Sequence, residues 1–160
     1  MKTRYYAGIG SRKTPQSIQR RMTRDAMRLQ AAEYVLRSGG AEGADRAFEA
    51  GAGAAKQIYT PIKATKRALI KAQDIWLLRD DRRGWPFEPG SYIGKLMGRS
   101  AMVIEGLNMG VPVEFVLCWT PRAEWIGGTA QSLWHADSLG IPIYNYADET
   151  PKIKDLIATA

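Results

Sequence analysis

Cysteine, histidine and long apolar runs are almost absent from this sequence of 160 residues. Cys118 is the single cysteine and His135 the single histidine, which excludes an internal disulfide framework and a Cys/His zinc site. We therefore expect no metal, and no motif calls for a cofactor. No apolar run is long enough to span a bilayer, and the N-terminal segment lacks the apolar core of a signal peptide. These absences predict a cytoplasmic protein that does not contact a membrane.

Two common nucleotide-binding motifs are also missing. The sequence contains no Gly-x-x-x-x-Gly-Lys-Ser/Thr loop, which excludes hydrolysis of nucleoside triphosphates by that device. The segment Gly8-Ile9-Gly10 starts like a dinucleotide fingerprint, but Lys13 stands where the third glycine belongs. No acidic residue ends the second predicted strand to hold a ribose. An ordinary NAD site is therefore not predicted.

What the sequence does contain is positive charge, and it is unevenly placed. The formal net charge is +7, and 45% of the residues are hydrophobic, within the range of globular domains. Residues 1–80 hold 16 Lys/Arg against 7 Asp/Glu, a balance of +9, whereas residues 81–160 hold 7 against 9, a balance of −2. A basic half attracts phosphate, either of a small nucleotide or of a nucleic-acid strand, and a merely solvated surface is the alternative.

Alternating apolar and helical patterns predict an α/β fold. We expect a single Rossmann-like three-layer domain over residues 1–160, with a mainly parallel sheet of about five strands. A first long helix follows a predicted cap at Thr14, with Pro15 at its first position and a buried stripe that runs from Ile18 to Leu36. The predicted strands are 4–7, 34–37, 56–60, 111–119 and 141–145, and the later helices are 45–54, 65–78, 91–107, 127–139 and 152–158.

Residues 62–90 interrupt the alternation of strands and helices. We interpret them as an insertion over the binding cleft, because long connections in compact domains often form lids or binding loops. Trp76 and Trp85 are candidates for stacking on a base there. A core position on a helix face is the alternative for Trp76.

Three glycine-rich segments follow predicted strands. The most informative is residues 38–45, Ser-Gly-Gly-Ala-Glu-Gly-Ala-Asp, and the others are residues 8–12 and 127–129. Glycines let the backbone approach a ligand, and the following helix start directs unpaired N–H groups toward an anion. We predict a shared phosphate site where the loops meet. Its residues are Gly8, Gly10, Ser11, Arg12, Ser38, Gly39, Gly40, Gly43, Asp45, Gly127, Gly128 and Thr129.

Some of these side chains have plainer interpretations. Ser11 and Arg12 can grip phosphate oxygens, and helix capping or solvation is the alternative. Asp45 lies in a first helical turn, where a carboxylate caps and favours the helix dipole. Cys118 leaves a strand and is a candidate nucleophile, but a small buried hydrophobe is the stronger interpretation because His135 has no evident orienting partner.

Four of the segments together resemble a known superfamily. Gly10-Ser11-Arg12, the 38–45 segment, Gly98-Arg99-Ser100 and Gly128-Thr129 are similar, in order, to loops of the DprA/Smf and LOG-like proteins of the SLOG superfamily. The resemblance extends over nearly the whole chain. It implies a Rossmann-like sheet that binds nucleotides, nucleotide-derived signals or, in DprA, single-stranded DNA. It adds Arg99 to the phosphate-binding residues and favours a homodimer or a higher homo-oligomer.

The sequence also departs from the enzymes of that superfamily. LOG-like phosphoribohydrolases carry Pro-Gly-Gly-x-Gly-Thr-x-x-Glu, and here Ser132 stands three positions beyond Thr129 in place of the glutamate. Glu42 and Arg99 are the remaining candidates for catalysis. The sequence therefore leaves open whether the chain is an enzyme.

Three functions follow from these observations. The first is binding of a nucleotide or nucleotide derivative by the glycine-rich loops at the carboxyl ends of the strands. The second is cleavage of the N-glycosidic bond of a nucleoside monophosphate. The third is DprA-like binding of single-stranded DNA through the basic half and the tryptophans.

Overall fold

The first strand of the chain lies at the centre of the sheet. β1 (Arg4–Gly10) pairs in parallel with β2 (Tyr34–Ser38) on one side and with β4 (Val116–Trp119) on the other. β3 (Lys56–Ile58) and β5 (Ile143–Asn145) form the two edges, so the order is β3-β2-β1-β4-β5. All of these pairs are parallel. The predicted sheet of about five strands is confirmed.

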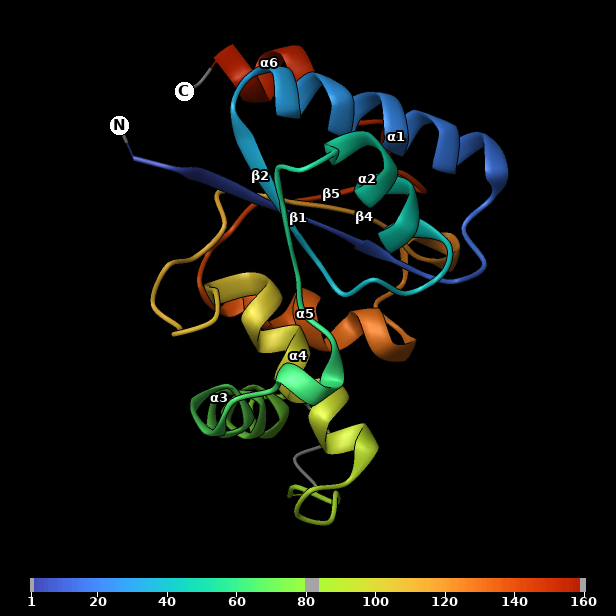
Figure 1. Ribbon diagram of the computed structural model, residues 1–160. Coiled ribbons are helices and arrows are strands. Elements are labelled where there is room, and N and C mark those ends of the chain that lie inside the picture. Colours follow the sequence, from blue (N-terminus) through green and yellow to red (C-terminus); the bar gives the residue numbers. More distant parts are fainter. Residues whose placement is uncertain (1, 80–83, 159–160) are drawn as a thin grey trace.

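Helices cover both faces of this sheet in the computed structural model, which describes residues 2–79 and 84–158. They are α1 (Gln16–Ala31), α2 (Ala44–Ala52), α3 (Lys66–Leu77), α4 (Tyr92–Glu105), α5 (Gly127–Ser138) and α6 (Ile153–Ala158), with short 3-10 turns at Pro61–Lys63 and Pro121–Ala123. In Figure 1, α1, α2 and α6 lie on one face and α3, α4 and α5 on the other. This arrangement confirms the α/β, Rossmann-like, three-layer architecture. None of the helices in the described residues is long and apolar enough to cross a bilayer.

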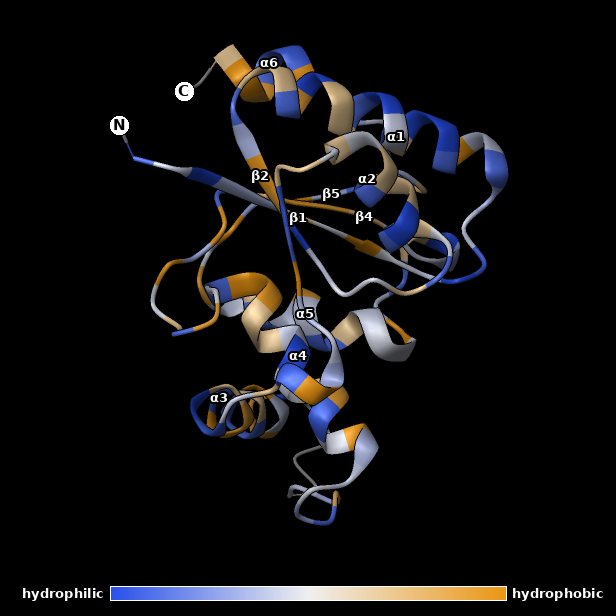
Figure 2. Cartoon of the chain, in the orientation of Figure 1, coloured by the Kyte–Doolittle hydropathy of each residue, from blue (hydrophilic) through white to orange (hydrophobic). Residues whose placement is uncertain are grey.

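Each face of the sheet has its own core. Alternate residues of a strand point to opposite faces, so Tyr6 packs with Leu36 and Phe48 under α1 and α2, whereas Ile9 packs with Met102 on the other side. β4 is hydrophobic along most of its length, and the outward face of α1 is hydrophilic (Figure 2). Burial on both faces explains why β4 reads as a continuous apolar run rather than an alternating one.

The prediction that the fourth strand starts at residue 111 is wrong, because β4 begins at Val116. The Val113 amide donates to the carbonyl of Ile104 at the end of α4, at 2.9 Å. Residues 111–113 therefore fold back on the preceding helix, and pairing with β1 starts only where the Glu114 amide reaches the Tyr5 carbonyl at 2.8 Å. An apolar sequence pattern does not show whether a buried amide bonds to a preceding helix or to a neighbouring strand.

The predicted start and stripe of the first helix also need correction. Pro15 is the cap residue of α1, and the Thr14 hydroxyl instead donates to the Ser11 carbonyl at 2.6 Å. The helix ends at Ala31, and Glu33 takes a positive φ of 66° in the turn that follows. Leu36 is therefore part of β2 and does not belong to the buried stripe of the helix. A turn separates α1 from β2 because the chain must reverse its direction between the helix and the strand.

The 62–90 segment contains α3, which packs against α4 and α5. The rings of Trp76, Trp85 and Phe87 form one cluster, with edge-to-face centroid distances of 4.9 to 6.2 Å. The indole N–H of Trp76 donates to the Gly84 carbonyl at 2.7 Å. Residues 80–83 of this segment lie outside the described residues, and its role as an insertion stays a prediction.

Candidate functional site

The carboxyl ends of β1, β2 and β4 lie at one edge of the sheet, because the three strands are parallel neighbours. The loop after β1 contacts both of the other strand ends there. The Ser11 amide donates to the Trp119 carbonyl at 3.1 Å, and the Ala44 amide donates to the Ser11 carbonyl at 3.4 Å. Gly43 allows this approach, since a Cβ there would lie 2.5 Å from the Ser11 carbonyl oxygen and its φ is +85°. The structure thus brings the first two glycine-rich loops together.

The carboxylate of Asp45 occupies the centre of this junction. It is buried, and it accepts a hydrogen bond from the Ala41 amide at 3.3 Å. The amides of Gly39 and Gly10 also act on it and favour its charged form. Gly43, not Asp45, is the cap residue of α2. Amides that the sequence assigns to a phosphate are therefore turned toward a carboxylate of the chain itself, and their assignment to a ligand stays a prediction.

Arg99 of α4 lies beside this carboxylate. Its Nη1 donates to the Gly39 carbonyl at 2.8 Å. Burial raises the pKa of Asp45 to about 6, and the charge of Arg99 opposes that shift. Burial likewise lowers the pKa of Arg99 from its ordinary value, against the attraction of Asp45. Within residues 2–79 and 84–158 the hydrogen bonds of Arg99 all run through Nη1, so its other N–H groups are available to an anion.

The raised pKa of Asp45 predicts a pH dependence of folding. Below about pH 4 the group is protonated in both states, and as pH rises toward 6 the unfolded chain ionises first. The free energy of unfolding therefore falls by about 3 kcal/mol as pH rises from about 4, the ordinary pKa of an aspartate, through about 6, the pKa of Asp45 in the folded protein. We expect the Asp45→Asn variant to lose this dependence when urea unfolding is compared at pH 4 and pH 7.

Glu42→Gln is the matched control for that experiment, because Glu42 is exposed and lies on the same loop. The stability difference between wild type and Asp45→Asn should favour wild type more at pH 4 than at pH 7. A difference that stays constant over this range contradicts the assignment of the titration to Asp45.

Two further side chains surround Arg99 at the surface. The charge of Arg12 helps to lower the pKa of Arg99, and Tyr92 acts in the opposite direction, so both lie within electrostatic range of its guanidinium group. Tyr92 is 66% exposed and stands in the first turn of α4. The Ser11 hydroxyl accepts from the Lys13 amide at 3.0 Å, which is a local turn contact. The result is a pair of guanidinium groups beside an exposed aromatic ring.

Tyr92 is the residue that sequence reasoning missed. A cap at Ser91 was readable from the sequence, and the Ser91 hydroxyl does accept from the Gly94 amide at 3.1 Å. α4 is the helix that precedes β4, so it must run toward the amino edge where β4 begins, and its first turn lies nearer the carboxyl edge. That topological step was the available signal.

The two candidate catalytic residues are not brought together by any described contact. Glu42 has a side chain that is 70% exposed and pairs with Arg46 at 3.7 Å. In the described part of the chain, the charges that shift the pKa of Arg99 belong to Asp45, Tyr92 and Arg12, and Glu42 is not among them. A carboxylate on the open surface lacks the enclosure that a glycosidase gives its general acid.

The third glycine-rich loop shares no hydrogen bond with the other two in the part of the chain that the structure describes. Gly127 and Gly128 open α5 at the surface, where an added Cβ would meet nothing within 4 Å. Among the described residues no hydrogen bond joins Gly127, Gly128 or Thr129 to the first two loops. Their part in a shared site stays a prediction.

Two other candidate residues are buried. Burial raises the pKa of Cys118 to about 12, so this side chain is a neutral thiol packed as a small hydrophobe. Ser132 is also buried, and its hydroxyl lies 3.5 Å from the Ser100 carbonyl. Ser132 therefore joins two helices and faces no open site.

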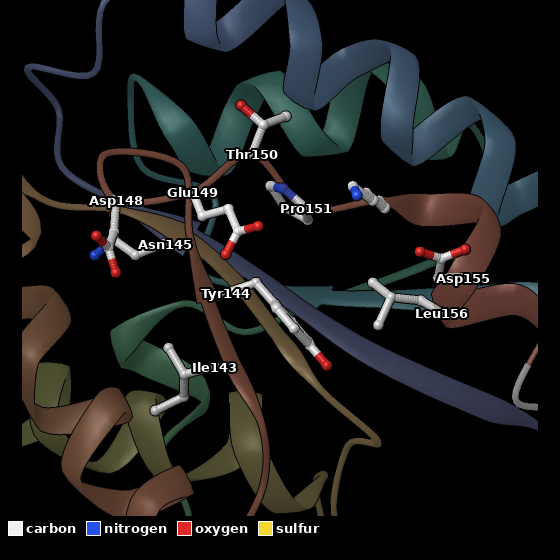
Figure 3. Close-up of a pocket in the computed structure, with 10 residues that line it drawn as sticks. Ile143, Tyr144, Asn145, Asp148, Glu149, Thr150, Pro151, Asp155 and Leu156 are labelled. Atoms are coloured by element: carbon white, nitrogen blue, oxygen red, sulfur yellow. The ribbon is translucent and has the colours of Figure 1, made fainter.

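Two cavities of the structure have linings that include no residue of the glycine-rich loops. The larger one, about 270 Å³, lies between edge strand β5 and α6. Figure 3 shows Glu149 and Asp155 on either side of Tyr144 at this cavity. The smaller one, about 240 Å³, lies between α3 and the end of α4. Arg12 and Arg99 of the carboxyl edge line neither of these two cavities.

The sheet order, the two helical layers and the loops at the carboxyl edge define a DprA-like Rossmann fold. The matching solved structure comes from a study of the single-stranded DNA binding mode of DNA processing protein A from Helicobacter pylori. The TM-score is 0.63 at 17% sequence identity, over 98% of this chain and 79% of that chain. At this identity the match shows a shared fold. No protein-family model and no curated protein matches the chain, and membership of the SLOG superfamily stays a prediction.

Proposed function

We propose that this protein binds single-stranded nucleic acid at the carboxyl edge of its sheet. The observation that carries the proposal is the group of Arg12, Arg99 and exposed Tyr92 beside the first two glycine-rich loops. Guanidinium groups bind the phosphates of a strand, and an aromatic ring stacks on a base of any identity. The fold shared with a protein studied for its single-stranded DNA binding supports the same conclusion.

The electrostatics of the edge support binding of a polyanion. Arg12 and Arg99 act on one another electrostatically, and Asp45 is the carboxylate that acts on the pKa of Arg99. That carboxylate is buried and already engaged by backbone amides. The two arginines are therefore positive groups with which a phosphate can pair.

Binding of a small nucleotide is the second candidate, and the 38–45 segment favours it because its amides already hold a carboxylate. A phosphate that displaced the carboxylate of Asp45 would accept hydrogen bonds from the same N–H groups. Arg12 and Arg99 line neither of the two cavities described above, whereas small-molecule sites are usually concave. A strand gains from several contacts along the carboxyl edge, so the geometry favours the polymer. The glycosidase activity and the homo-oligomer stay predictions.

Salt dependence provides the test. We expect a fluorescently labelled oligo-dT to bind with fluorescence anisotropy that rises to saturation. The logarithm of the association constant should fall with the logarithm of the salt concentration, with a slope of about −0.7 for each phosphate contacted, because bound counterions are released. Contacts with Arg12 and Arg99 alone predict a slope of about −1.4. Random-sequence and oligo-dT strands should bind within a few-fold of each other.

Two controls sharpen this measurement. Tyr92→Ala should weaken binding about tenfold, since stacking of one base contributes about 1–3 kcal/mol. Lys154→Ala removes one positive charge from exposed α6 and should leave the affinity nearly unchanged. An affinity that does not depend on salt, or that falls as much in Lys154→Ala as in Tyr92→Ala, overturns the proposed site. Saturable binding of a mononucleotide without binding of the oligonucleotide promotes the second candidate.

A further inference from the structure

A second charged site lies at the opposite edge of the sheet, around Glu105. This residue ends α4, six positions after Arg99, which is about 9 Å along the helix axis at 1.5 Å per residue. The next residues lead to the amino end of β4, where the Glu114 amide donates to the carbonyl of Tyr5 near the start of β1. Glu105 therefore belongs to the amino edge, away from the proposed nucleic-acid site.

Glu105 is a buried carboxylate in an unfavourable place. It is 9% exposed and stands at a helix C-terminus, where the helix dipole disfavours negative charge. Its Oε2 lies 2.6 Å from Nε2 of His135 and 3.9 Å from Nζ of Lys71. Burial lowers the pKa of His135, so at neutral pH the imidazole gives a hydrogen bond but no compensating charge. Lys71 thus compensates the carboxylate only loosely.

The second carboxylate oxygen of Glu105 is open to a further donor. In the described part of the chain, the hydrogen bond and the ion pairs of Glu105 all involve Oε2. Oε1 is not among the buried atoms that lack a partner, and Glu105 lines a cavity. A buried carboxylate that lines a cavity and keeps one oxygen without a described hydrogen bond can accept from a ligand there.

The cavity is a groove of about 240 Å³ between α3 and the end of α4. Two cations, two carboxylates and two apolar side chains line it: Arg67, Lys71, Asp74, Glu105, Ile70 and Met109. It is smaller than the pockets of about 300–1,000 Å³ that hold drug-sized molecules. The guanidinium of Arg67 has a weak contact with the Asn108 carbonyl at 3.5 Å and is otherwise exposed to solvent.

We propose that this groove binds a small zwitterion of the α-amino-acid class, with its ammonium group on Glu105 and its carboxylate on Arg67. A simple anion would meet Glu105 and Asp74, and a simple cation would meet Arg67 and Lys71. A molecule that carries both charges satisfies both sets. Ile70 and Met109 form an apolar wall, so the ligand carries an aliphatic side chain.

Ligand-observed saturation-transfer NMR with L-leucine tests this proposal. Isoamylamine and 4-methylpentanoate serve as probes that lack the carboxylate and the ammonium group. We expect L-leucine to bind with a dissociation constant in the millimolar range or lower, and each half-molecule to bind at least tenfold more weakly. Glu105→Gln and Arg67→Ala should each weaken binding of L-leucine at least tenfold, because each removes one charged hydrogen bond.

The controls are Glu88→Gln and Lys66→Ala, which make the same kinds of change at exposed positions outside the groove. Both should bind L-leucine like wild type. Arg67→Ala changes an exposed side chain, so it keeps the test valid even if Glu105→Gln unfolds the protein. Absence of L-leucine binding at 10 mM, equal binding of a half-molecule, or binding that Arg67→Ala leaves unchanged overturns the proposal. The proposed amino-acid site does not depend on nucleic-acid binding, so the result of the oligonucleotide experiment does not bear on it.

Discussion

Replacing Arg99 with alanine should weaken binding of a single-stranded oligonucleotide about 10- to 100-fold. Nη1 of Arg99 donates a hydrogen bond to the Gly39 carbonyl at 2.8 Å. This bond fixes the orientation of the remaining N–H groups of the guanidinium. A hydrogen bond to a charged group contributes about 1.5–3 kcal/mol, and each 1.4 kcal/mol is a factor of ten in affinity. Fluorescence anisotropy at two salt concentrations measures the loss, and the salt slope should become shallower by about 0.7.

A second variant separates the position of Arg99 from its charge. A Cβ at Gly39 would fall on Nη1 of Arg99, so Gly39→Ala should displace the guanidinium group and keep its charge. We expect a loss of affinity with little change in salt slope. If Gly39→Ala binds like wild type while Arg99→Ala does not, Arg99 acts through charge alone and the anchored geometry is irrelevant. If neither variant loses affinity, the strand binds elsewhere.

Replacing Gly51 with alanine should destabilise the protein by about 3 kcal/mol or more. Gly51 lies in α2 where it crosses α1, and a Cβ there would overlap the carbonyl oxygen of Thr23 in α1. Backbone atoms cannot rotate away, so the two helices must separate over one of the most extensive helix contacts in the fold. Overpacking a close interface typically costs about 1–3 kcal/mol when side chains can adjust, and here they cannot.

Thermal unfolding measures this effect, since 1 kcal/mol shifts Tm by about 2–4 °C for a domain of this size. Gly128→Ala is the matched control, because its added Cβ meets nothing within 4 Å and it stands in the first turn of α5. The control should unfold within a degree or two of wild type. A Gly51→Ala variant as stable as the control contradicts the close crossing of α1 and α2.

The features of the fold that local chemistry determines could be predicted from the sequence. The helices predicted to begin at residues 65 and 91 do begin beside Thr65 and Ser91, whose hydroxyl oxygens cap them. The alternation of strands and helices also predicted a parallel sheet. In these cases the deciding interactions lie within a few residues along the chain.

The features that could not be predicted depend on residues distant in sequence. The burial of Asp45 needs the amides of Gly10 and Gly39 and the guanidinium of Arg99 to meet at one point. The same holds for Glu105, whose partner His135 comes from a later helix. Both side chains are ordinary surface carboxylates by sequence pattern. Only the packing of the strands and helices reveals that each is buried.

The position of β1 has a consequence for how the chain folds. Ala7 pairs with Arg37 on one side and with Val116 on the other, so the central strand is made first and its second neighbour comes much later in the sequence. During synthesis the exposed edge of Arg4–Gly10 must wait, unpaired, until residues 116–119 leave the ribosome. Such long-range pairing slows folding. We expect the nascent chain to depend on a chaperone, or on early packing of α1 and α2, to keep that edge from pairing with other chains.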